Sequence, residues 1–474
     1  MNTFEIFDFI NYLNFVEKQE FPNKMAKSAF NELFYRIVER SGLFESCPKF
    51  VITYIFNKKN QVKEKIPFEI QNCTDKKLRK IIKKHLFGNK IDRTLLLHFE
   101  IFCLCNILKA DLNVASGNFW ACFDYSDKKK TKIWSKITDL SQIKNQKVKS
   151  SFYDVLNFIS ATKKYQNQKI FDIAVCATMS AGKSTFVNAL LGNDYLPARN
   201  EATTAKITSV YDNDSQQKMI GFAGDKDKGN ILDISDDLQR ENIDEWNSEP
   251  EVEHIYLQSD LDSISSGTVI CAVHDTPGTN NSADSNHQKI TMDFLESQKL
   301  DMIIFVANAT QLKTTDEKKL LDEIYEKVVS KKNIPVLFVL NKADELDSEK
   351  EDLPAILKNY RKYIEEIGYK NCEILPVSAK AAGLFKMALK GKDELFTESE
   401  CDDFLPIFKR FEKRLSFGKS ILESTESIEE EIIIDGENYE KQTLVQNLYK
   451  TGIRDIEKYI SKNLEKQGDV KNGD

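Results

Sequence analysis

Apolar and polar positions follow different patterns in the two parts of this chain. Across residues 1–45, apolar side chains recur at helical spacing and predict two amphipathic helices. Residues 75–86 and 92–108 are predicted helices as well, and residues 148–165 form another that leads into the second part of the chain. We therefore expect residues 1–165 to form a mainly helical domain.

From Lys169 onward the pattern changes to short runs of β-branched and aromatic residues. Helical segments separate most of these runs, which predicts a mostly parallel sheet with helices on both faces, the α/β class. In such sheets ligands bind at the carboxyl ends of the strands. The predicted strands are Ile170–Cys176, Thr268–His274, Asp301–Ala307, Val336–Leu340 and Glu373–Val377.

Charge divides the chain at the same place. Residues 1–167 hold 29 lysines and arginines against 17 aspartates and glutamates, whereas the whole chain has a net charge of −7. A basic domain of unknown function at 1–165, a second domain at 168–464 and a polar tail at 465–474 are predicted. An acidic insertion is expected near 385–445. The basic surface suits an anionic partner, with an ordinary solvated helix surface as the alternative.

Three further features bear on the cellular compartment. The nine cysteines show no paired metal-ligand spacing, which is typical of reduced thiols. The first ten residues lack the basic start of a signal peptide. The most apolar stretch, Leu95–Leu108, is too short and too polar to span a bilayer. A cytoplasmic protein is expected, peripheral to a membrane or to the nucleoid if the lysines bind an anionic surface.

A phosphate-binding loop follows the first predicted strand. The segment Ala177–Ser184 reads ATMSAGKS and opens a predicted helix, Ser184–Leu191. Backbone N–H groups of such a loop cradle phosphate oxygens. We expect Lys183 to bridge the β- and γ-phosphates and the Ser184 hydroxyl to bind Mg²⁺. The strict pattern fails at one position, because Ala177 stands where the first glycine is usual.

A second motif, Asp275-Thr276-Pro277-Gly278, comes directly after the predicted strand Thr268–His274. A carboxylate at the end of a strand is suited to contact Mg²⁺, and the Gly278 N–H is suited to meet the γ-phosphate. Taken alone, the segment is better explained as a simple Pro-Gly turn. Its position after a strand and after a phosphate loop favours the metal-binding role.

The third motif, Asn341-Lys342-Ala343-Asp344, supplies base specificity. The Asp344 carboxylate can accept hydrogen bonds from N1–H and N2–H₂ of guanine, and adenine presents no such donor pair. A site built for these bonds strongly rejects analogues that lack them. Asn341 is expected to tie this loop to the phosphate loop, and the Lys342 stem to cover the base.

The fourth motif, Ser378-Ala379-Lys380, follows the last predicted strand, and its backbone is expected to touch the guanine O6. Four motifs in this order, each after a predicted strand, identify a P-loop GTPase that uses GTP with Mg²⁺. The full set of expected nucleotide-binding residues is Thr178, Met179, Ser180, Ala181, Gly182, Lys183, Ser184, Thr185, Asp275, Gly278, Asn341, Lys342, Asp344, Ser378, Ala379 and Lys380.

These residues resemble the dynamin superfamily. The segment Ala177–Gly192 resembles its phosphate loop and first helix, and Leu196–Thr208 and Asp275–Ser282 resemble the bacterial dynamin-like group. Asn308–Leu312 and Asn341–Asp347 do so as well. The resemblance covers roughly residues 169–380 and 450–464, where the last helix of that GTPase domain is expected, and it leaves residues 1–165 and the acidic insertion unexplained.

The resemblance implies a catalytic mechanism. A switch threonine, Thr204 with Thr203 beside it, would bind Mg²⁺ and the attacking water, so the expected metal ligands are Ser184, Thr204 and Asp275. Ser180 matches the catalytic serine of the family, and Lys183 and Thr204 complete the expected catalytic set. Thr279 replaces the glutamine of small GTPases, and Met179 departs from the polar residue of true dynamins.

The resemblance also implies GTP hydrolysis stimulated by self-association, through a homodimer of GTPase domains. The alternative function is a regulatory GTPase switch that binds a protein or nucleic-acid partner through the basic N-terminal domain. A further alternative is a GTP-binding scaffold without activity, supported by Ala177 and Met179 alone. Partners compatible with the lysines are an anionic membrane surface or a nucleic acid, and an unidentified protein partner fits the switch hypothesis.

Overall fold

A computed structural model describes most of residues 168–469, the segment 73–85 and isolated positions elsewhere between 3 and 165. Within 168–469, the residues outside the description are 198–205, 215, 217, 226–230, 262, 265–268, 279–284, 348, 421–429 and 435. The chain divides into two compact units. The first contains residues 1–167 and 227–236, and the second contains residues 168–226 and 237–474.

Helix α6 (Asp75–His85) is the longest described segment of the first unit. Its first turn is held by Thr74, whose Oγ1 accepts a hydrogen bond from the Lys77 N–H at 3.4 Å. Arg36 and Arg40 pair with Asp75 at 3.0 and 2.6 Å. The helix predicted at 75–86 is thus confirmed. The other helices predicted before residue 166 lie largely outside the described residues.

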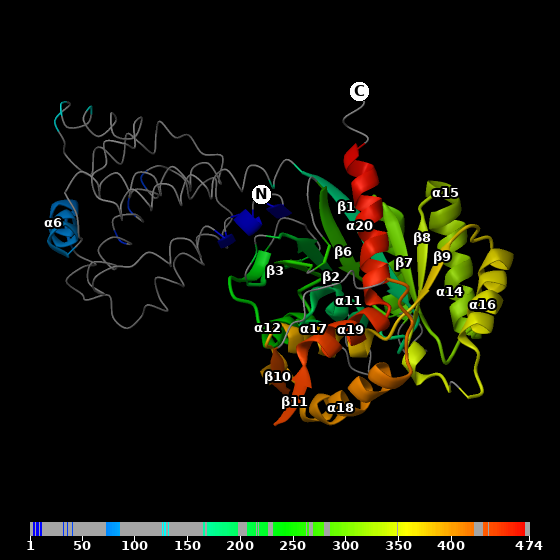
Figure 1. The fold of residues 1–474 in the computed structure, drawn as a ribbon. Helices are drawn as coiled ribbons and strands as arrows, with labels where there is room; N and C mark the ends of the chain where they lie inside the picture. The colour runs from blue at the N-terminus through cyan, green and yellow to red at the C-terminus, as the bar shows by residue number, and fades with distance from the viewer. Residues whose placement is uncertain are drawn as a thin grey trace. The chain divides into compact units, whose positions relative to one another are not determined.

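A nine-stranded sheet forms the centre of the described structure (Figure 1). The strand order is β4-β3-β5-β2-β6-β1-β7-β8-β9. The strands are β1 (Lys169–Ala177), β2 (Ile207–Asp212), β3 (Ile220–Gly224), β4 (Ile231–Ser235), β5 (His254–Ser259), β6 (Val269–Asp275), β7 (Met302–Asn308), β8 (Val336–Asn341) and β9 (Glu373–Pro376).

Strands β6, β1, β7, β8 and β9 pair in parallel, as the apolar runs predicted. Each of these five strands lies within one residue of its predicted bounds at either end. Strand β2 runs antiparallel to β6, and β3 runs antiparallel to β5. The predicted mostly parallel α/β sheet is confirmed, and the carboxyl ends of β1, β6 and β8 share one edge of it.

Helices cover both faces of this sheet (Figure 1). One apolar core contains side chains of α11, α12, α17, α18, α19 and α20, and a second core contains those of α13, α14 and α16. Their bounds are α11 (Lys183–Leu191), α12 (Arg240–Ser248), α13 (Ser285–Ser297), α14 (Thr315–Ile324), α16 (Leu353–Ile367), α17 (Ala379–Leu389), α18 (Glu398–Lys413), α19 (Lys441–Lys450) and α20 (Ile453–Asp469). A π-helical turn (Tyr325–Val329) joins α14 to the short α15 (Ser330–Lys332). Among the described residues, no helix has both the length and the apolar character needed to cross a membrane.

The acidic region expected near 385–445 packs against helix α17, where rings of α18 meet the ring of Phe385. Helix α18 begins at a capping box in which Thr397 and Glu400 exchange hydrogen bonds. A two-stranded antiparallel hairpin, β10 (Glu431–Ile434) and β11 (Glu437–Glu440), precedes α19. Tyr439 of the hairpin contacts Phe404 and Phe408 of α18 through its ring. The region is therefore part of the folded body wherever it is described.

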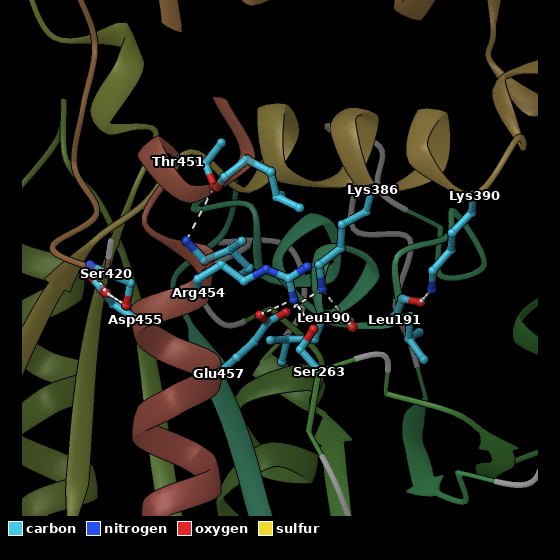
Figure 2. A network of polar contacts seen from close by, with 12 residues as sticks. Leu190, Leu191, Ser263, Lys386, Lys390, Ser420, Thr451, Arg454, Asp455 and Glu457 are labelled. Carbon is cyan, nitrogen blue, oxygen red and sulfur yellow. Dashed lines mark hydrogen bonds and ion pairs between the residues drawn. The ribbon is translucent and has the colours of Figure 1, made fainter. Parts of the chain in front are cut away.

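A buried ion pair joins α17 to α20, and the same helix α17 closes the end of α11 (Figure 2). Lys386 pairs with Glu457, and their side chains are 1% and 2% exposed. Lys386 also donates to the Leu190 carbonyl, and Lys390 donates to the Leu191 carbonyl, each at 3.3 Å. The last carbonyls of a helix lack partners within it, so the two ammonium groups stabilise the end of α11.

Candidate nucleotide site

The predicted phosphate loop connects β1 to α11, and its backbone is sharply turned. Ser180 and Gly182 have positive φ angles of 60° and 81°. A Cβ on Gly182 would lie 2.4 Å from Nδ2 of Asn341, so both the angle and the space require glycine there. Ala177 ends β1 opposite Val306 and is not among the residues with positive φ. Glycine is therefore not needed at that position.

Three side chains meet where α11 begins. Asp275, fully buried at the end of β6, offers one carboxylate oxygen to each of the first two residues of α11. Lys183 Nζ pairs with Oδ1, and Ser184 Oγ donates to Oδ2 at 3.0 Å. The lysine is 6% exposed, so the carboxylate supplies the counter-charge that a buried ammonium requires. The sequence predicted that these three residues belong to one site, and they are adjacent.

The rest of the second motif lies against the phosphate loop. Thr276 donates from Oγ1 to the Val175 carbonyl of β1 at 2.8 Å, and Thr291 of α13 donates to the Pro277 carbonyl at 3.1 Å. A Cβ on Gly278 would lie 3.8 Å from Cα of Met179. Gly278 therefore lies beside Met179 of the phosphate loop.

Asn341 links three loops. Its Nδ2 donates to the Ala181 carbonyl at 2.9 Å, and its Oδ1 accepts a hydrogen bond from the Ala379 N–H at 3.0 Å. The expected tie to the phosphate loop is present, and a second tie, to the loop after β9, was not predicted. The Asn341 backbone is held as well, because its carbonyl accepts from the Ala309 N–H at 2.8 Å.

The predicted base-recognition loop is a tight 3₁₀ turn, Ala343–Glu345, entered through Lys342 in a left-handed conformation with φ 61°. The Ala343 N–H donates to the Val377 carbonyl at 3.2 Å, which fixes the turn to the end of β9. Asp344 is 8% exposed. Arg410 of α18 donates to the backbone carbonyl of Asp344, a contact that the sequence did not predict.

The fourth motif caps α17. The Ser378 hydroxyl accepts a hydrogen bond from the Ala381 N–H at 3.3 Å, and the Ser378 N–H donates to the Thr451 carbonyl at 3.0 Å. Serine is a preferred residue at this N-cap position. Lys380 points to α18, where it pairs with Asp403. The site residues that the sequence missed, Arg410 and Asp403, thus both come from α18, and no motif in the sequence marks them.

Two residues of the phosphate loop are exposed to solvent. They are Met179, which is 41% exposed, and its neighbour Ser180. Thr185 is partly buried in the first turn of α11. Thr203, Thr204 and Thr279 lie outside the described residues, so their predicted roles stay predictions.

Cys176, near the end of β1, is a fully buried thiol. Burial raises the pKa of Cys176 to about 12, and Lys183 and Thr276 offset this only in part. The thiol therefore stays neutral near pH 7 and is not a nucleophile. Cys271 in β6 is also fully buried.

Residues 173–343 match the model of the dynamin family. The matched segment runs from β1 through Ala343 and includes the phosphate loop and the Asp275 motif. The chain carries a dynamin-type P-loop GTPase domain. Asp344 and the fourth motif lie just beyond the matched segment, so their expected roles in guanine binding stay predictions.

Two curated relatives resemble this chain. An uncharacterized protein in the xynA 3′ region of Caldicellulosiruptor is 28% identical over 301 residues, which is 62% of this chain and 68% of that one. Dynamin-like protein 1 of Campylobacter jejuni is 28% identical over 271 residues, which is 49% of this chain and 36% of that one. The chain thus spans about a third of the length of this dynamin-like relative.

A solved structure of an oligomerised bacterial dynamin pair, described as a mechanism for long-range sensing and tethering of membranes, is 19% identical. The match covers 82% of this chain and 68% of that chain, with a TM-score of 0.37. Because this TM-score is low, the resemblance to dynamin-like proteins rests on the sequence matches.

Proposed function

We propose that this protein is a dynamin-like GTPase that binds GTP with Mg²⁺ and hydrolyses it to GDP and phosphate. The observation that carries the proposal is the meeting of Lys183, Ser184 and Asp275 at the start of α11, directly beside the turned backbone of residues 178–182. Asn341 connects this phosphate-binding part to both loops that would hold the base. One connected site thus offers groups for phosphate, metal and guanine.

The charged groups have separate roles in this proposal. With GTP bound, Lys183 turns from Asp275 to the β- and γ-phosphates, where its charge offsets that of the transferred group. Ser184 and Asp275 present a hydroxyl and a carboxylate 3.0 Å apart, and Mg²⁺ prefers such oxygen ligands. Thr204 would add a further ligand. The metal would supply positive charge to the phosphate oxygens.

Hydrolysis needs little covalent chemistry from the protein. The oxygen of a water molecule forms a bond to the γ-phosphorus, and the bond from that phosphorus to the β–γ bridging oxygen breaks. The electron pair of that bond stays on GDP, and the water proton ends on phosphate. Thr204 and Ser180 would position the water, while the backbone N–H groups of the loop hold the phosphate oxygens.

Self-association is the second part of the proposal. Ser180 and Met179 lie exposed at the turn of the phosphate loop, where a second GTPase domain can reach the nucleotide. A homodimer in which two domains face each other across their nucleotides would complete each site. This arrangement predicts low turnover for the isolated protein and higher turnover per molecule as protein concentration rises.

The basic N-terminal unit would contact an anionic surface. Lys76, Lys77 and Lys80 are exposed on α6, while Leu78 on the same helix is buried. Lysines arranged in this way attract anionic lipid headgroups, each contributing about 1 kcal/mol close to the surface. We propose a cytoplasmic protein peripheral to a membrane. The names of the sequence relatives do not support the alternatives. These are a nucleic-acid partner, a nucleoid location and a switch function with a protein partner.

Phosphate release from GTP, measured over a range of protein concentrations with and without anionic liposomes, tests the proposal. Specific activity should rise with protein concentration and rise further with liposomes, and Lys183→Ala should be inactive under all conditions. Concentration-independent turnover would refute the dimer. Stimulation by DNA instead of liposomes would replace the membrane with a nucleic acid.

A further inference from the structure

Helix α18 is anchored rigidly beside the base-recognition loops. Its apolar face consists of Phe404, Ile407, Phe408 and Phe411, all of them buried. The rings of Phe404, Phe408 and Phe411 lie 5.8–6.3 Å from the ring of Phe385 in α17. Burial of these phenylalanine rings stabilises the packing of α18 against α17. The helix therefore provides a fixed platform.

A second stripe of α18 carries two charged residues two turns apart. Asp403 and Arg410 are seven positions apart, so they lie on the same side of the helix, roughly 10 Å from each other along its axis. Asp403 pairs with Lys380 in the loop after β9. Arg410 donates to the carbonyl of Asp344 in the loop after β8. One helix face thus contacts both loops that would hold the guanine.

The two contacts differ in strength. The side chains of Lys380 and Asp403 are 50% and 43% exposed, and ion pairs at such exposure contribute little to stability. The Arg410 contact is partly buried and joins a charged donor to a backbone carbonyl. A hydrogen bond from a charged donor is stronger than one between neutral groups. Arg410 is therefore the residue of this stripe with a measurable effect on the loop.

The Asp344 carbonyl belongs to the same residue whose carboxylate would read the base. Holding this carbonyl fixes the peptide that follows Asp344, and with it the direction in which the side chain leaves the 3₁₀ turn. The loop is held at its other end by the Ala343 N–H, which donates to Val377. Arg410 thus fixes the end of the turn that the sheet does not hold.

We infer that α18 is a specificity clamp in which Arg410 is a positioning residue for guanine recognition by Asp344. The inference rests on the proposed guanine site and extends it to a segment outside the GTPase motifs. The clamp acts on the two hydrogen bonds from guanine N1–H and N2–H₂ to the carboxylate. Inosine lacks the 2-amino group and forms only one of these hydrogen bonds. The clamp therefore contributes less to the affinity for inosine nucleotides.

The experiment compares the dissociation constants of fluorescently labelled GDP and IDP for the full chain. In Arg410→Met, which keeps the stem and removes all donors, the Kd for GDP should rise about tenfold. The Kd for IDP should rise less, so the preference for GDP over IDP decreases. Arg410→Lys retains one charged donor and should recover most of the preference. Lys409→Met, an exposed lysine on the same helix, is the matched control and should change neither constant.

Equal weakening of GDP and IDP in Arg410→Met, or no weakening of either, would overturn the clamp. If Arg410→Met does not fold, Arg410→Gln serves instead: a partial loss of preference supports the clamp and an unchanged preference refutes it. Asp344→Asn tests the underlying site separately, because its amide should shift the preference toward XDP. If Asp344→Asn loses the preference for guanine and the Arg410 variants keep it, only the clamp is refuted. A wild-type protein without guanine preference would refute the proposed site.

Discussion

A buried carboxyl group in α14 makes the stability of this protein depend on pH. Glu317 lies in the first turn of the helix, after the N-cap Thr314, and is 1% exposed. Burial raises the pKa of Glu317 from 4.5 to about 7, and contacts with Tyr360 and the Lys313 backbone offset the rise only in part. We predict that replacing Glu317 with Gln, a neutral side chain of the same shape, stabilises the folded protein at pH 8.

The sign follows from the direction of the shift. Because the folded-state pKa of Glu317 lies above its unfolded value, the folded state binds this proton more tightly than the unfolded state. The resulting stabilisation is fully present below pH 4.5 and is lost as pH rises through 7. A shift of this size corresponds to about 3 kcal/mol in the free energy of unfolding. Glu317→Gln should match the wild type near pH 4.5 and exceed it by up to about 3 kcal/mol at pH 8.

Thermal unfolding of wild type and variant, followed between pH 5 and pH 8, measures the effect. Asp316→Asn is the matched control, because it removes a carboxylate from the same helical turn at an exposed position. The difference in unfolding temperature between Glu317→Gln and wild type should grow with pH, and the Asp316→Asn difference should not. A Glu317→Gln protein that is less stable than wild type at pH 8 would refute the reasoning.

Three further changes test other parts of the structure. Lys386→Met should destabilise the protein by about 1–3 kcal/mol in chemical denaturation, because it leaves Oε1 of the buried Glu457 carboxylate without its partner while Arg454 stays paired with Oε2; an unchanged stability would contradict this. Gly182→Ala should abolish GDP binding in a titration, because its Cβ would overlap the Asn341 amide, whereas Gly383→Ala, where nothing lies within 4 Å, should bind normally. Asp275→Asn should lose the Mg²⁺ dependence of GTP affinity, and an unchanged dependence would move the metal away from Asp275.

The parallel strands were predictable because each is a continuous apolar run buried on both faces. Strand β2 was not predicted, since half of its six residues are polar although all six are buried. Its Ser209 hydroxyl lies 2.6 Å from ring nitrogens of both His254 and His274, on the two neighbouring strands. Such pairing satisfies buried polar groups, and it becomes visible only when the strand order is known.

The motif residues were predictable in the same way, because each motif directly follows a strand. Helix α18 was hidden by its acidic composition, although the spacing of Phe404, Phe408 and Phe411 is helical. The contact from Arg410 to the Asp344 carbonyl joins residues 66 positions apart and involves a backbone atom. A backbone acceptor leaves no signature in the sequence, so this part of the site required the structure.

The most direct test of the central claim is nucleotide turnover by the full chain with GTP and with ATP in the presence of Mg²⁺. The proposed site predicts release of phosphate from GTP, no measurable release from ATP, and loss of the GTP activity in Lys183→Ala. Equal turnover of GTP and ATP would contradict guanine recognition by Asp344. Turnover of GTP that survives Lys183→Ala would place the chemistry outside this site.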